Sequence, residues 1–288
     1  MSIDSPPSTL CIVGLGMIGG SFAAALKKAG FSGEIVALVR SESTGARGLA
    51  LGIVDRFSTD PKEVIAKADI VMLAVPMLSM REQLSAIADF LDPDAIVTDA
   101  GSVKGPFIDD ARAVFGSLAR VVPGHPIAGR EKTGVDAADA SLFEDKRVLL
   151  TPLDETEQDA INTVASLWEL TGAVVESLSP SQHDRVLAAT SHLPHVLAFA
   201  LVDTLAKQQE AEEIFRYAAG GFRDFSRIAS SDAVMWRDVC LSNRDAILES
   251  MDKLDDHLKQ LRVAIESSDG AAIETIFARA KQARDNYT

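Results

Sequence analysis

A glycine-rich turn near the N-terminus constrains the fold of this chain more than any other feature. An apolar run, residues 10–13, is followed by glycines spaced as G-x-G-x-x-G and by a segment of helical pattern, residues 21–28. Strand, turn and helix in this order are typical of a dinucleotide-binding βαβ unit. Gly14 would permit the tight turn, Gly16 would let a pyrophosphate approach the backbone, and Gly19 would let helix pack on strand. The predicted cofactor-binding residues of this turn are Gly14, Leu15, Gly16, Met17, Ile18 and Gly19.

The end of the second apolar run, residues 34–39, bears on the choice of cofactor. NAD sites usually place an acidic residue about 20 residues beyond the glycines, where it binds the ribose hydroxyls. Here Arg40 and Ser41 follow instead, with Thr44 close behind. A guanidinium and hydroxyls suit the 2′-phosphate of NADP, so we expect Arg40, Ser41 and Thr44 to bind NADP. In the alternative, Arg40 is a solvated charge, Glu42 supplies the carboxylate, and the cofactor is NAD.

Further short apolar runs are typical of parallel strands buried on both faces. Several of them end in glycine-rich or polar loops, which a doubly wound sheet gathers at one edge together with its ligand. Val75 and Pro76 end one such run and are counted as cofactor-binding residues on that basis. The predicted strands are residues 68–76, 95–98, 121–122, 147–151 and 173–176.

Beyond residue 179 the apolar pattern changes from strand to helix. Ile247, Met251, Leu254 and Leu258 recur at helical intervals, and no persuasive strand run follows residue 182. We therefore predict an α/β chain of two domains. Residues 1–179 would form a Rossmann-type doubly wound sheet that binds NAD(P), and residues 180–288 an all-helical domain. Long apolar stripes of this kind often pair with a second copy, so we expect a homodimer.

Composition and charge exclude several classes of protein. The chain has 288 residues, is 47% hydrophobic, and contains no apolar run near the roughly 18 residues that a membrane helix needs. A formal charge of −14 argues against nucleic acid or anionic membranes as partners and leaves a small-molecule substrate. Cys11 and Cys240 lie far apart in the sequence, which predicts neither a disulfide framework nor a metal site, and favours the reducing cytoplasm.

The five histidines differ in their sequence surroundings. His125 lies in a glycine- and proline-rich loop, residues 123–129, at the predicted ligand edge of the sheet, which makes it a candidate catalytic group. His192 and His195 are three residues apart on a predicted helix. Without a third ligand they are a weak metal signal, and we favour helix packing or contact with substrate. His183 and His257 are predicted to be peripheral.

A serine and an arginine-rich segment are the other candidates. Ser102 follows a glycine after a predicted strand and could cap the next helix, donate a hydrogen bond to substrate, or do both. Residues 220–227 place Arg223, Asp224 and Arg227 after a glycine pair. These charges could form a surface salt-bridge cluster. In a chain this acidic, we favour an arginine that points into the cleft between domains and binds a carboxylate.

Five motifs, taken together and in order, resemble the prephenate and arogenate dehydrogenases of tyrosine biosynthesis, including the broad-specificity cyclohexadienyl type. The first motif is generic to Rossmann proteins, whereas the other four are specific. The resemblance implies a nucleotide-binding domain followed by a helical dimerisation domain, in agreement with the pattern of apolar residues. The matching segments are residues 14–21, 98–104, 123–129, 191–195 and 221–227.

The resemblance also implies a reaction and a role for each site residue. The family oxidatively decarboxylates a cyclohexadienyl ring: hydride leaves the carbon bearing the hydroxyl, and carbon dioxide departs as the ring becomes aromatic. By resemblance, His125 polarises or deprotonates the hydroxyl, with Ser102 as its partner. The residues implied on the substrate side are Arg227 as the carboxylate ligand, His195 as a further contact, and Glu131 and Asp224 as acids that form an ionic gate with Arg227.

The departures from the family pattern affect substrate choice. Arg130 stands where relatives often carry a small hydroxyl residue, and Glu131 occupies a position where arogenate-specific relatives often lack an acid. The resemblance therefore favours prephenate or dual use over an arogenate-specific dehydrogenase. A β-hydroxyacid-type reductase would need a helical-domain lysine in a glycine-rich setting, which is absent from the sequence. A non-catalytic NADP sensor would not need His125, Ser102 and Arg227 to converge.

Overall fold

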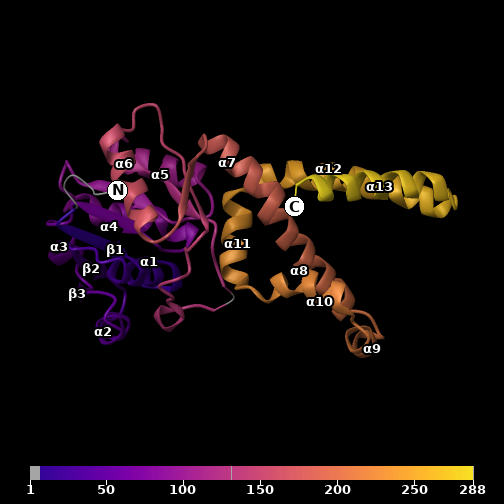
Figure 1. The fold of residues 1–288 in the computed structure, drawn as a ribbon, viewed down its shortest axis with the longest axis horizontal. Coiled ribbons are helices and arrows are strands. Elements are labelled where there is room, and N and C mark those ends of the chain that lie inside the picture. The colour runs from indigo at the N-terminus through magenta and orange to yellow at the C-terminus, as the bar shows by residue number, and fades with distance from the viewer. Residues whose placement is uncertain (1–6, 131, 288) are drawn as a thin grey trace.

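A six-stranded parallel sheet forms the centre of the N-terminal half (Figure 1). The computed structural model describes residues 7–130 and 132–287. Every neighbouring pair in the sheet is parallel, and the strand order β3-β2-β1-β4-β5-β6 reverses direction of winding beside β1. This confirms the doubly wound α/β fold. The strands are β1 (Thr9–Val13), β2 (Glu34–Leu38), β3 (Arg56–Ser58), β4 (Ile70–Leu73), β5 (Ile96–Asp99) and β6 (Val121–Val122).

Helices cover both faces of this sheet, and the alternation of side chains along each strand supplies a core to each face. In β1, Leu10 and Ile12 join one apolar cluster, while Cys11 and Val13 join the other. In the first cluster Phe22 packs on Trp168, with ring centroids 4.4 Å apart. The helices are α1 (Met17–Lys28), α2 (Glu42–Ala50), α3 (Pro61–Val64), α4 (Met80–Ala88), α5 (Gly105–Phe115) and α6 (Gln158–Leu170), with short 3₁₀ turns at Met77–Ser79 and Val135–Ala137.

A second, three-stranded sheet continues the N-terminal half. In it β7 (Gly124–Pro126) runs antiparallel to β8 (Arg147–Leu150), which is parallel to β9 (Val174–Ser177). The strands predicted at 147–151 and 173–176 therefore exist, but they lie outside the main sheet. The chain leaves the six-stranded sheet at Pro123, because proline has no N–H to donate to a neighbouring strand. The Pro123 carbonyl accepts from Thr151 N–H at 2.8 Å, at the start of the second sheet. As a result His125 lies on a strand, and the prediction of a loop there was wrong.

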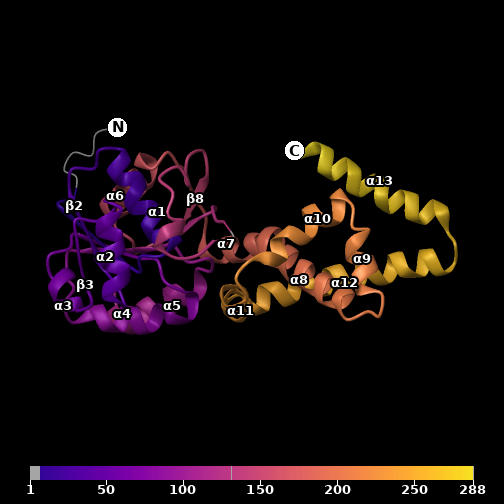
Figure 2. The same ribbon diagram turned by 90° about the horizontal axis from the view of Figure 1, so that it is seen from below.

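The C-terminal half is helical, as predicted, and extends away from the sheets (Figures 1 and 2). Its last two helices meet at a turn, diverge from it in roughly opposite directions, and reach furthest from the sheets (Figure 2). A π-helical turn precedes Pro194, which cannot donate to the preceding turn. The elements are α7 (Pro180–Leu187), the π-helical turn η3 (Ala188–His192), α8 (Leu193–Ala206), α9 (Ala211–Arg216), α10 (Gly220–Ser226), the 3₁₀ turn η4 (Arg227–Ser230), α11 (Ala233–Ser242), α12 (Arg244–Glu266) and α13 (Gly270–Asn286).

Apolar side chains of the helical half are mostly left uncovered within one chain. The helical segment Pro180–Ala206 is long and apolar enough to span a membrane by length and composition. Its most apolar 18-residue window has a mean hydropathy of 1.4, and only 22% of that window is buried. That hydropathy is an average over the window, whereas the sequence prediction concerned uninterrupted apolar runs. The first turns of the segment also carry His183 and Asp184, whose polar contacts join it to the sheet half. Its exposed apolar surface therefore indicates contact with another protein surface. The surface is not by itself evidence for a membrane.

Candidate active site

The glycine turn after β1 has the geometry that a bound pyrophosphate requires. Gly14 has φ +94°, a conformation that L side chains rarely adopt, and a Cβ there would lie 2.7 Å from the Ala74 carbonyl oxygen. A Cβ on Gly19 would lie 2.3 Å from the Gly14 carbonyl oxygen, so Gly19 permits the packing of α1 on the turn. A Cβ on Gly16 would meet nothing within 4 Å. Gly16 therefore faces open space on the side where a ligand would approach.

The residues after Gly16 make this open space suitable for an anion. Gly16 is the N-cap of α1, no side chain caps the helix, and no acidic residue lies in its first turn. Backbone N–H groups near Met17 and Ile18 are thus left for a ligand at the positive end of the helix. Leu15 is buried in the core below the turn. Val75 also borders the turn, because one of its methyl carbons lies 2.7 Å from the position of a Cβ on Gly14.

The predicted 2′-phosphate site lies at the start of α2. Arg40 is exposed at the end of β2, and Ser41 is the N-cap of α2, accepting from Thr44 N–H at 3.3 Å. The two hydroxyls, Ser41 Oγ and Thr44 Oγ1, are 2.9 Å apart. The chain therefore gathers hydroxyls beside an exposed guanidinium and a helix N-terminus, a set of groups suited to phosphate. Glu42, the alternative ribose ligand, is exposed on the first turn of the same helix.

A buried ion pair fixes the backbone around His125. Lys104 Nζ lies 2.6 Å from Asp99 Oδ2 and donates to the Gly124 carbonyl at 2.5 Å, while Gly124 N–H donates to Asp99 Oδ1 at 3.1 Å. Both charged side chains are fully buried. Burial disfavours their charged forms, raising the pKa of Asp99 and lowering the pKa of Lys104, and their mutual attraction opposes both shifts. The pair thereby joins the end of β5 to the start of β7.

His125 is buried on β7, and its surroundings keep the imidazole neutral. Burial lowers the pKa of His125 well below its usual value, and the neighbouring groups His183, Lys104 and His192 lower it further. A neutral imidazole near physiological pH can accept a proton from a substrate hydroxyl. His125 is therefore in the protonation state that accepting a proton requires.

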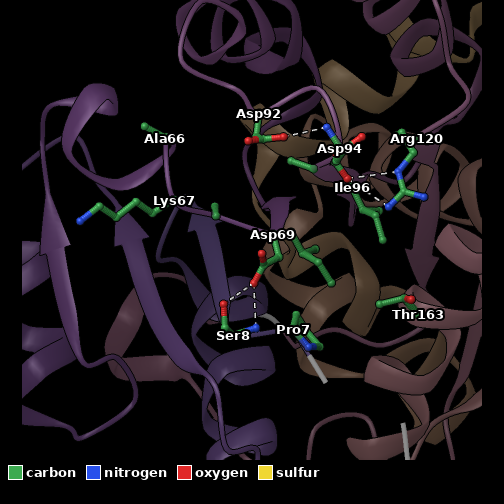
Figure 3. Close-up of a pocket in the computed structure, with 13 residues that line it drawn as sticks. Pro7, Ser8, Ala66, Lys67, Asp69, Asp92, Asp94, Ile96, Arg120 and Thr163 are labelled. Carbon is green, nitrogen blue, oxygen red and sulfur yellow. Dashed lines mark hydrogen bonds between the residues drawn. The ribbon is translucent and has the colours of Figure 1, made fainter. Parts of the chain in front are cut away.

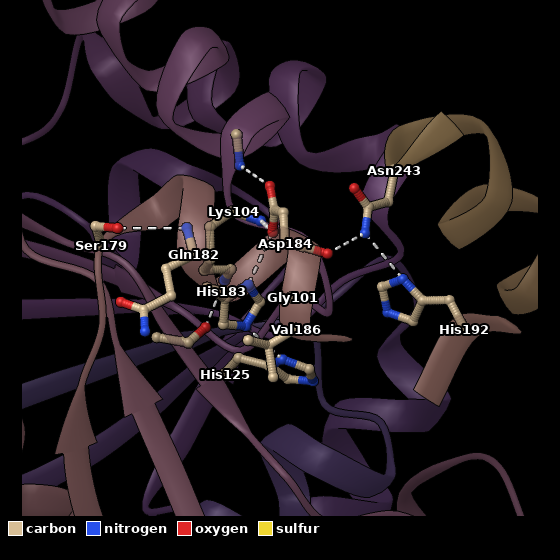
Figure 4. Close-up of polar contacts among 12 residues, drawn as sticks. Gly101, Lys104, His125, Ser179, Gln182, His183, Asp184, Val186, His192 and Asn243 are labelled. Carbon is tan, nitrogen blue, oxygen red and sulfur yellow. Dashed lines mark hydrogen bonds and ion pairs between the residues drawn. The ribbon is translucent and has the colours of Figure 1, made fainter. Parts of the chain in front are cut away.

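Sequence reasoning placed His183 at the periphery, and this was wrong. His183 is fully buried, and its Nε2 lies 2.9 Å from His125 Nδ1 (Figure 4). Its Nδ1 in turn lies 2.8 Å from Asp184 Oδ1. Asp184 lies on α7, in the helical half, so these contacts connect the two halves of the chain. The available signal was an acidic residue beside a histidine just after a helix start, but nothing local pointed it toward His125.

Asp184 also explains why Ser102 is not a helix cap. The carboxylate of Asp184 accepts from Lys104 N–H and from Gly105 N–H, each at 2.9 Å, and so occupies the N-terminus of α5. The N-cap of α5 is Lys104, and no capping bond comes from Ser102. The capping interpretation of Ser102 was therefore wrong. Ser102 remains partly exposed in the loop that the ion pair ties to β7, two residues before Lys104.

The other two candidate histidines have separate partners in the helical half. His192 Nδ1 lies 3.0 Å from Asn243 Nδ2, and burial lowers the pKa of His192 to about 4. His195 stacks on Trp236 with ring centroids 3.6 Å apart, and its Nδ1 donates to the Ser191 carbonyl at 2.8 Å. Among the described residues, no group of three His, Cys, Asp and Glu side chains could hold a metal ion. Helix packing therefore accounts for these contacts better than metal binding.

The described charged residues of the predicted substrate side are exposed. Arg227, the first residue of η4, is close enough to His195 that its charge lowers the pKa of that imidazole, after burial as the main cause. Asp224 is exposed on α10. Arg130 pairs with Asp139 at 2.5 Å on the surface of the sheet half. Glu131, the other predicted gate residue, lies outside the described residues.

A cavity of about 620 Å³ lies away from all of these residues (Figure 3). Three of its lining residues, Ser8, Asp69 and Arg120, lie directly before strands β1, β4 and β6. They therefore mark the amino edge of the parallel sheet, opposite the edge that carries the glycine turn. Ligands of such sheets bind at the carboxyl edge, so this cavity is not the candidate active site.

Comparison with known proteins accounts for both halves. Residues 22–177 match the nucleotide-binding domain of prephenate dehydrogenase, and residues 179–279 match the dimerization domain of prephenate dehydrogenase. A cyclohexadienyl dehydrogenase of Zymomonas mobilis is 38% identical over 96% of this chain and 94% of its own length. A prephenate dehydrogenase of Bacillus subtilis is 36% identical over 96% of this chain and 75% of its own.

Solved structures agree with these sequence matches. The prephenate dehydrogenase of A. aeolicus, in complex with hydroxyphenyl propionate and NAD+, is 37% identical, with a TM-score of 0.91 over 100% of both chains. The arogenate dehydrogenase of Synechocystis is 28% identical, with a TM-score of 0.83 over 97% of this chain and 100% of its own. In fold, domain order and sequence, the chain belongs to the prephenate dehydrogenase family.

Proposed function

We propose that the protein is an NAD(P)-dependent cyclohexadienyl dehydrogenase that oxidatively decarboxylates prephenate, and also arogenate, in tyrosine biosynthesis. The observation that carries this proposal is the setting of His125, a buried imidazole held in its neutral form on the strand that follows the parallel sheet. Family membership supports the substrate class, since relatives of 38% and 36% identity are named cyclohexadienyl and prephenate dehydrogenase. An arogenate-specific enzyme is the alternative.

The proposed steps balance in protons and electrons. His125 accepts the proton of the ring hydroxyl while the carbon bearing that hydroxyl becomes a carbonyl. The bound nicotinamide supplies the hydride acceptor. The bond to the ring carboxylate then breaks, and its electron pair enters the ring, which becomes aromatic as carbon dioxide leaves. The phenolate oxygen takes back the proton from His125, so no metal or covalent intermediate is needed.

The remaining site residues are proposed to bind and orient substrate. Ser102 lies on the loop tied to β7 and would fix the hydroxyl and the nicotinamide together. Arg227 would bind a substrate carboxylate through its planar guanidinium, with His195 as a neighbouring contact. Asp224 and Glu131 would form the ionic gate with Arg227, and Arg130 would adjust substrate choice from the adjoining position. The guanidinium charge felt at His195 supports this grouping.

For the cofactor we propose NADP in preference to NAD. The support is the phosphate-compatible set at the start of α2, with Arg40 exposed and without an acid directly after β2. The relative from A. aeolicus was solved with NAD+, so NAD is the alternative. An Arg40→Ala variant distinguishes the two: for an NADP enzyme, losing one charge-assisted contact raises the Kd for NADP about tenfold and leaves that for NAD unchanged.

We further propose two domains, residues 1–179 and 180–288, and a homodimer formed through the helical domain. The uncovered apolar side chains of the helical half and the matching dimerization domain of the family support a dimer. The free cysteines, one of them buried on β1, suit a reducing compartment, and we propose the cytoplasm.

One assay tests the proposed function. Purified protein is given prephenate and arogenate separately, with NADP and with NAD, and reduced nicotinamide is followed by its absorbance. We expect turnover of prephenate, slower turnover of arogenate, and a higher kcat/KM with NADP. Turnover of arogenate alone would replace the proposal by the arogenate-specific alternative. Cofactor binding without turnover of either substrate would contradict the enzymatic function.

A further inference from the structure

The candidate base His125 and two side chains behind it, from the other half of the molecule, form a continuous series of polar contacts. Asp184 Oδ1 lies 2.8 Å from His183 Nδ1, and His183 Nε2 lies 2.9 Å from His125 Nδ1 (Figure 4). Both imidazoles are buried, at 0% and 9% exposure for His183 and His125, so water does not compete freely for these contacts. The position of the proton in each of these hydrogen bonds decides which nitrogen of His125 is unprotonated and free to react.

The carboxylate fixes that direction at one end. Asp184 already accepts from two backbone N–H groups, those of Lys104 and Gly105. Burial would raise the pKa of Asp184, but the hydrogen bonds from His183 and from these two N–H groups outweigh it and hold the pKa below its usual value. Asp184 is therefore ionised near neutral pH and can only accept, so His183 must donate through Nδ1.

The two imidazoles transmit this orientation. With one proton on its ring, a His183 that donates through Nδ1 presents an unprotonated Nε2 to its neighbour. His125 must then donate through Nδ1, which leaves its own Nε2 without a proton. We propose that His183 and Asp184 are positioning residues that fix the tautomer of His125, so that Nε2 of His125 faces the substrate as the base. The substrate hydroxyl in this statement rests on the proposed function.

The other charged and titratable groups around His125 are engaged elsewhere. From the start of α5, Lys104 Nζ is held by Asp99 and by the Gly124 carbonyl. From η3, His192 has Asn243 at its Nδ1. The position of Asp184 is itself secured from the N-cap of α12, because Asn243 donates to the Asp184 carbonyl at 2.8 Å. These contacts leave His183 as the partner of His125 Nδ1. They also fix the position of Asp184, the residue that follows His183.

Proton transfer makes the same chain electrostatically useful. When His125 Nε2 takes the hydroxyl proton, the imidazolium is stabilised by its Nδ1 hydrogen bond to His183, which is supported by the Asp184 carboxylate. The proton returns to the phenolate oxygen at the end of the reaction, so His183 and Asp184 need not change protonation. Their contribution is orientation and charge, not transfer.

The tautomer can be observed directly on the full chain without substrate. Histidine ¹⁵N shifts of uniformly labelled protein near pH 8 distinguish Nδ1–H from Nε2–H rings, with the His125 signals assigned through a His125→Asn variant. We expect the Nδ1–H tautomer at His125. The Nε2–H tautomer at this position would overturn the proposal, whatever the activity of the protein.

A pair of variants at one position tests the consequence for catalysis. His183→Phe removes the acceptor, whereas His183→Gln can keep an amide oxygen near His125 Nδ1. We expect His183→Phe to lower kcat about 100-fold, at the lower end of general-base effects, with little change in KM or in the Kd for cofactor. His183→Gln should recover at least about tenfold of that loss. Equal kcat for both variants and the wild type would overturn the proposal.

The two levels of inference fail differently. Wild-type protein that turns over neither prephenate nor arogenate, yet shows Nδ1–H at His125, would refute the proposed function and support the positioning role. Active protein with Nε2–H at His125 would leave the function standing and refute the positioning role.

Discussion

The two halves of this molecule bury their side chains in opposite ways. The sheet half encloses two apolar clusters and a fully buried Asp99–Lys104 pair, and it keeps His125 almost out of water. The helical half buries few side chains within one chain and exposes large apolar residues such as Phe277 and Leu258. Arg227 lies on one of its exposed turns.

This difference matches two different chemical needs of the proposed reaction. Proton transfer from a hydroxyl benefits from a neutral base in a dry and rigid setting, because burial holds the imidazole unprotonated and its partners fix its orientation. Capture of a charged substrate benefits from a guanidinium that substrate can reach. The residues that join the two settings are His183 and Asp184, which belong to the helical half by sequence and to the surroundings of His125 by contact.

The largest expected effect is on the buried side. His125→Asn should lower kcat for prephenate by about 10²–10⁴-fold, the usual contribution of a general base, and leave NADP binding unchanged because the glycine turn is untouched. Initial rates and fluorescence titration with reduced cofactor measure the two quantities. His257→Asn, at an exposed position on α12, is the matched control and should behave as wild type. A fully active His125→Asn variant would end the assignment of the base.

Breaking the buried ion pair should cost stability. Lys104→Met leaves the Asp99 carboxylate buried without its cation, and we expect the free energy of unfolding to fall by about 3–5 kcal/mol. Urea unfolding followed by circular dichroism measures it. Lys207→Met removes the exposed partner of Asp203 and serves as the control, with no measurable change expected. If the two variants had similar free energies of unfolding, burial would not decide how much an ion pair contributes to stability, and the expectation would be wrong.

In the exposed helical half, Arg227→Leu should weaken the binding of substrate. We expect KM for prephenate to rise about 10–100-fold, the equivalent of one lost hydrogen bond to a charged group, with a smaller change in kcat. Arg227→Lys should recover only part of the loss, because an ammonium lacks the planar fork that matches a carboxylate. Arg223→Leu on the preceding helix is the control. An effect on kcat alone would contradict the binding role and would assign Arg227 to the chemical step at His125.

The last expected effect concerns acid and is spread over more than two pH units. Burial lowers the pKa of His192 to about 4, whereas an unfolded histidine titrates near 6.5, so the unfolded chain binds more protons between these values. Stability is therefore constant above pH 6.5 and falls by about 1.4 kcal/mol per pH unit from this residue as the pH drops toward 4. His125, also lowered by burial, adds to the same trend. Unfolding at several pH values should show a shallower slope for His192→Gln.

The sequence on its own determined the local elements and their order. The apolar runs, the G-x-G-x-x-G spacing and the change to helical periodicity predicted the parallel sheet, the cofactor turn and the helical half, because strand, turn and helix are encoded over a few neighbouring residues. It also made His125 a candidate, since glycine and proline beside a histidine are visible locally, and its catalytic role stays a prediction. NADP preference and the substrate-side roles stay predictions.

Only the tertiary structure decided what surrounds that histidine. His183 meets His125 across 58 positions, and Asp184 reaches Lys104 N–H across 80 positions, so no local pattern could reveal either contact. Separation along the sequence also explains two predictions that were wrong. Asp184, not Ser102, binds the N-terminus of α5, and β8 and β9 form a sheet with β7 and do not join the six-stranded sheet. Pairings between distant segments depend on how whole elements pack, and packing is settled by the summed burial of many side chains at once.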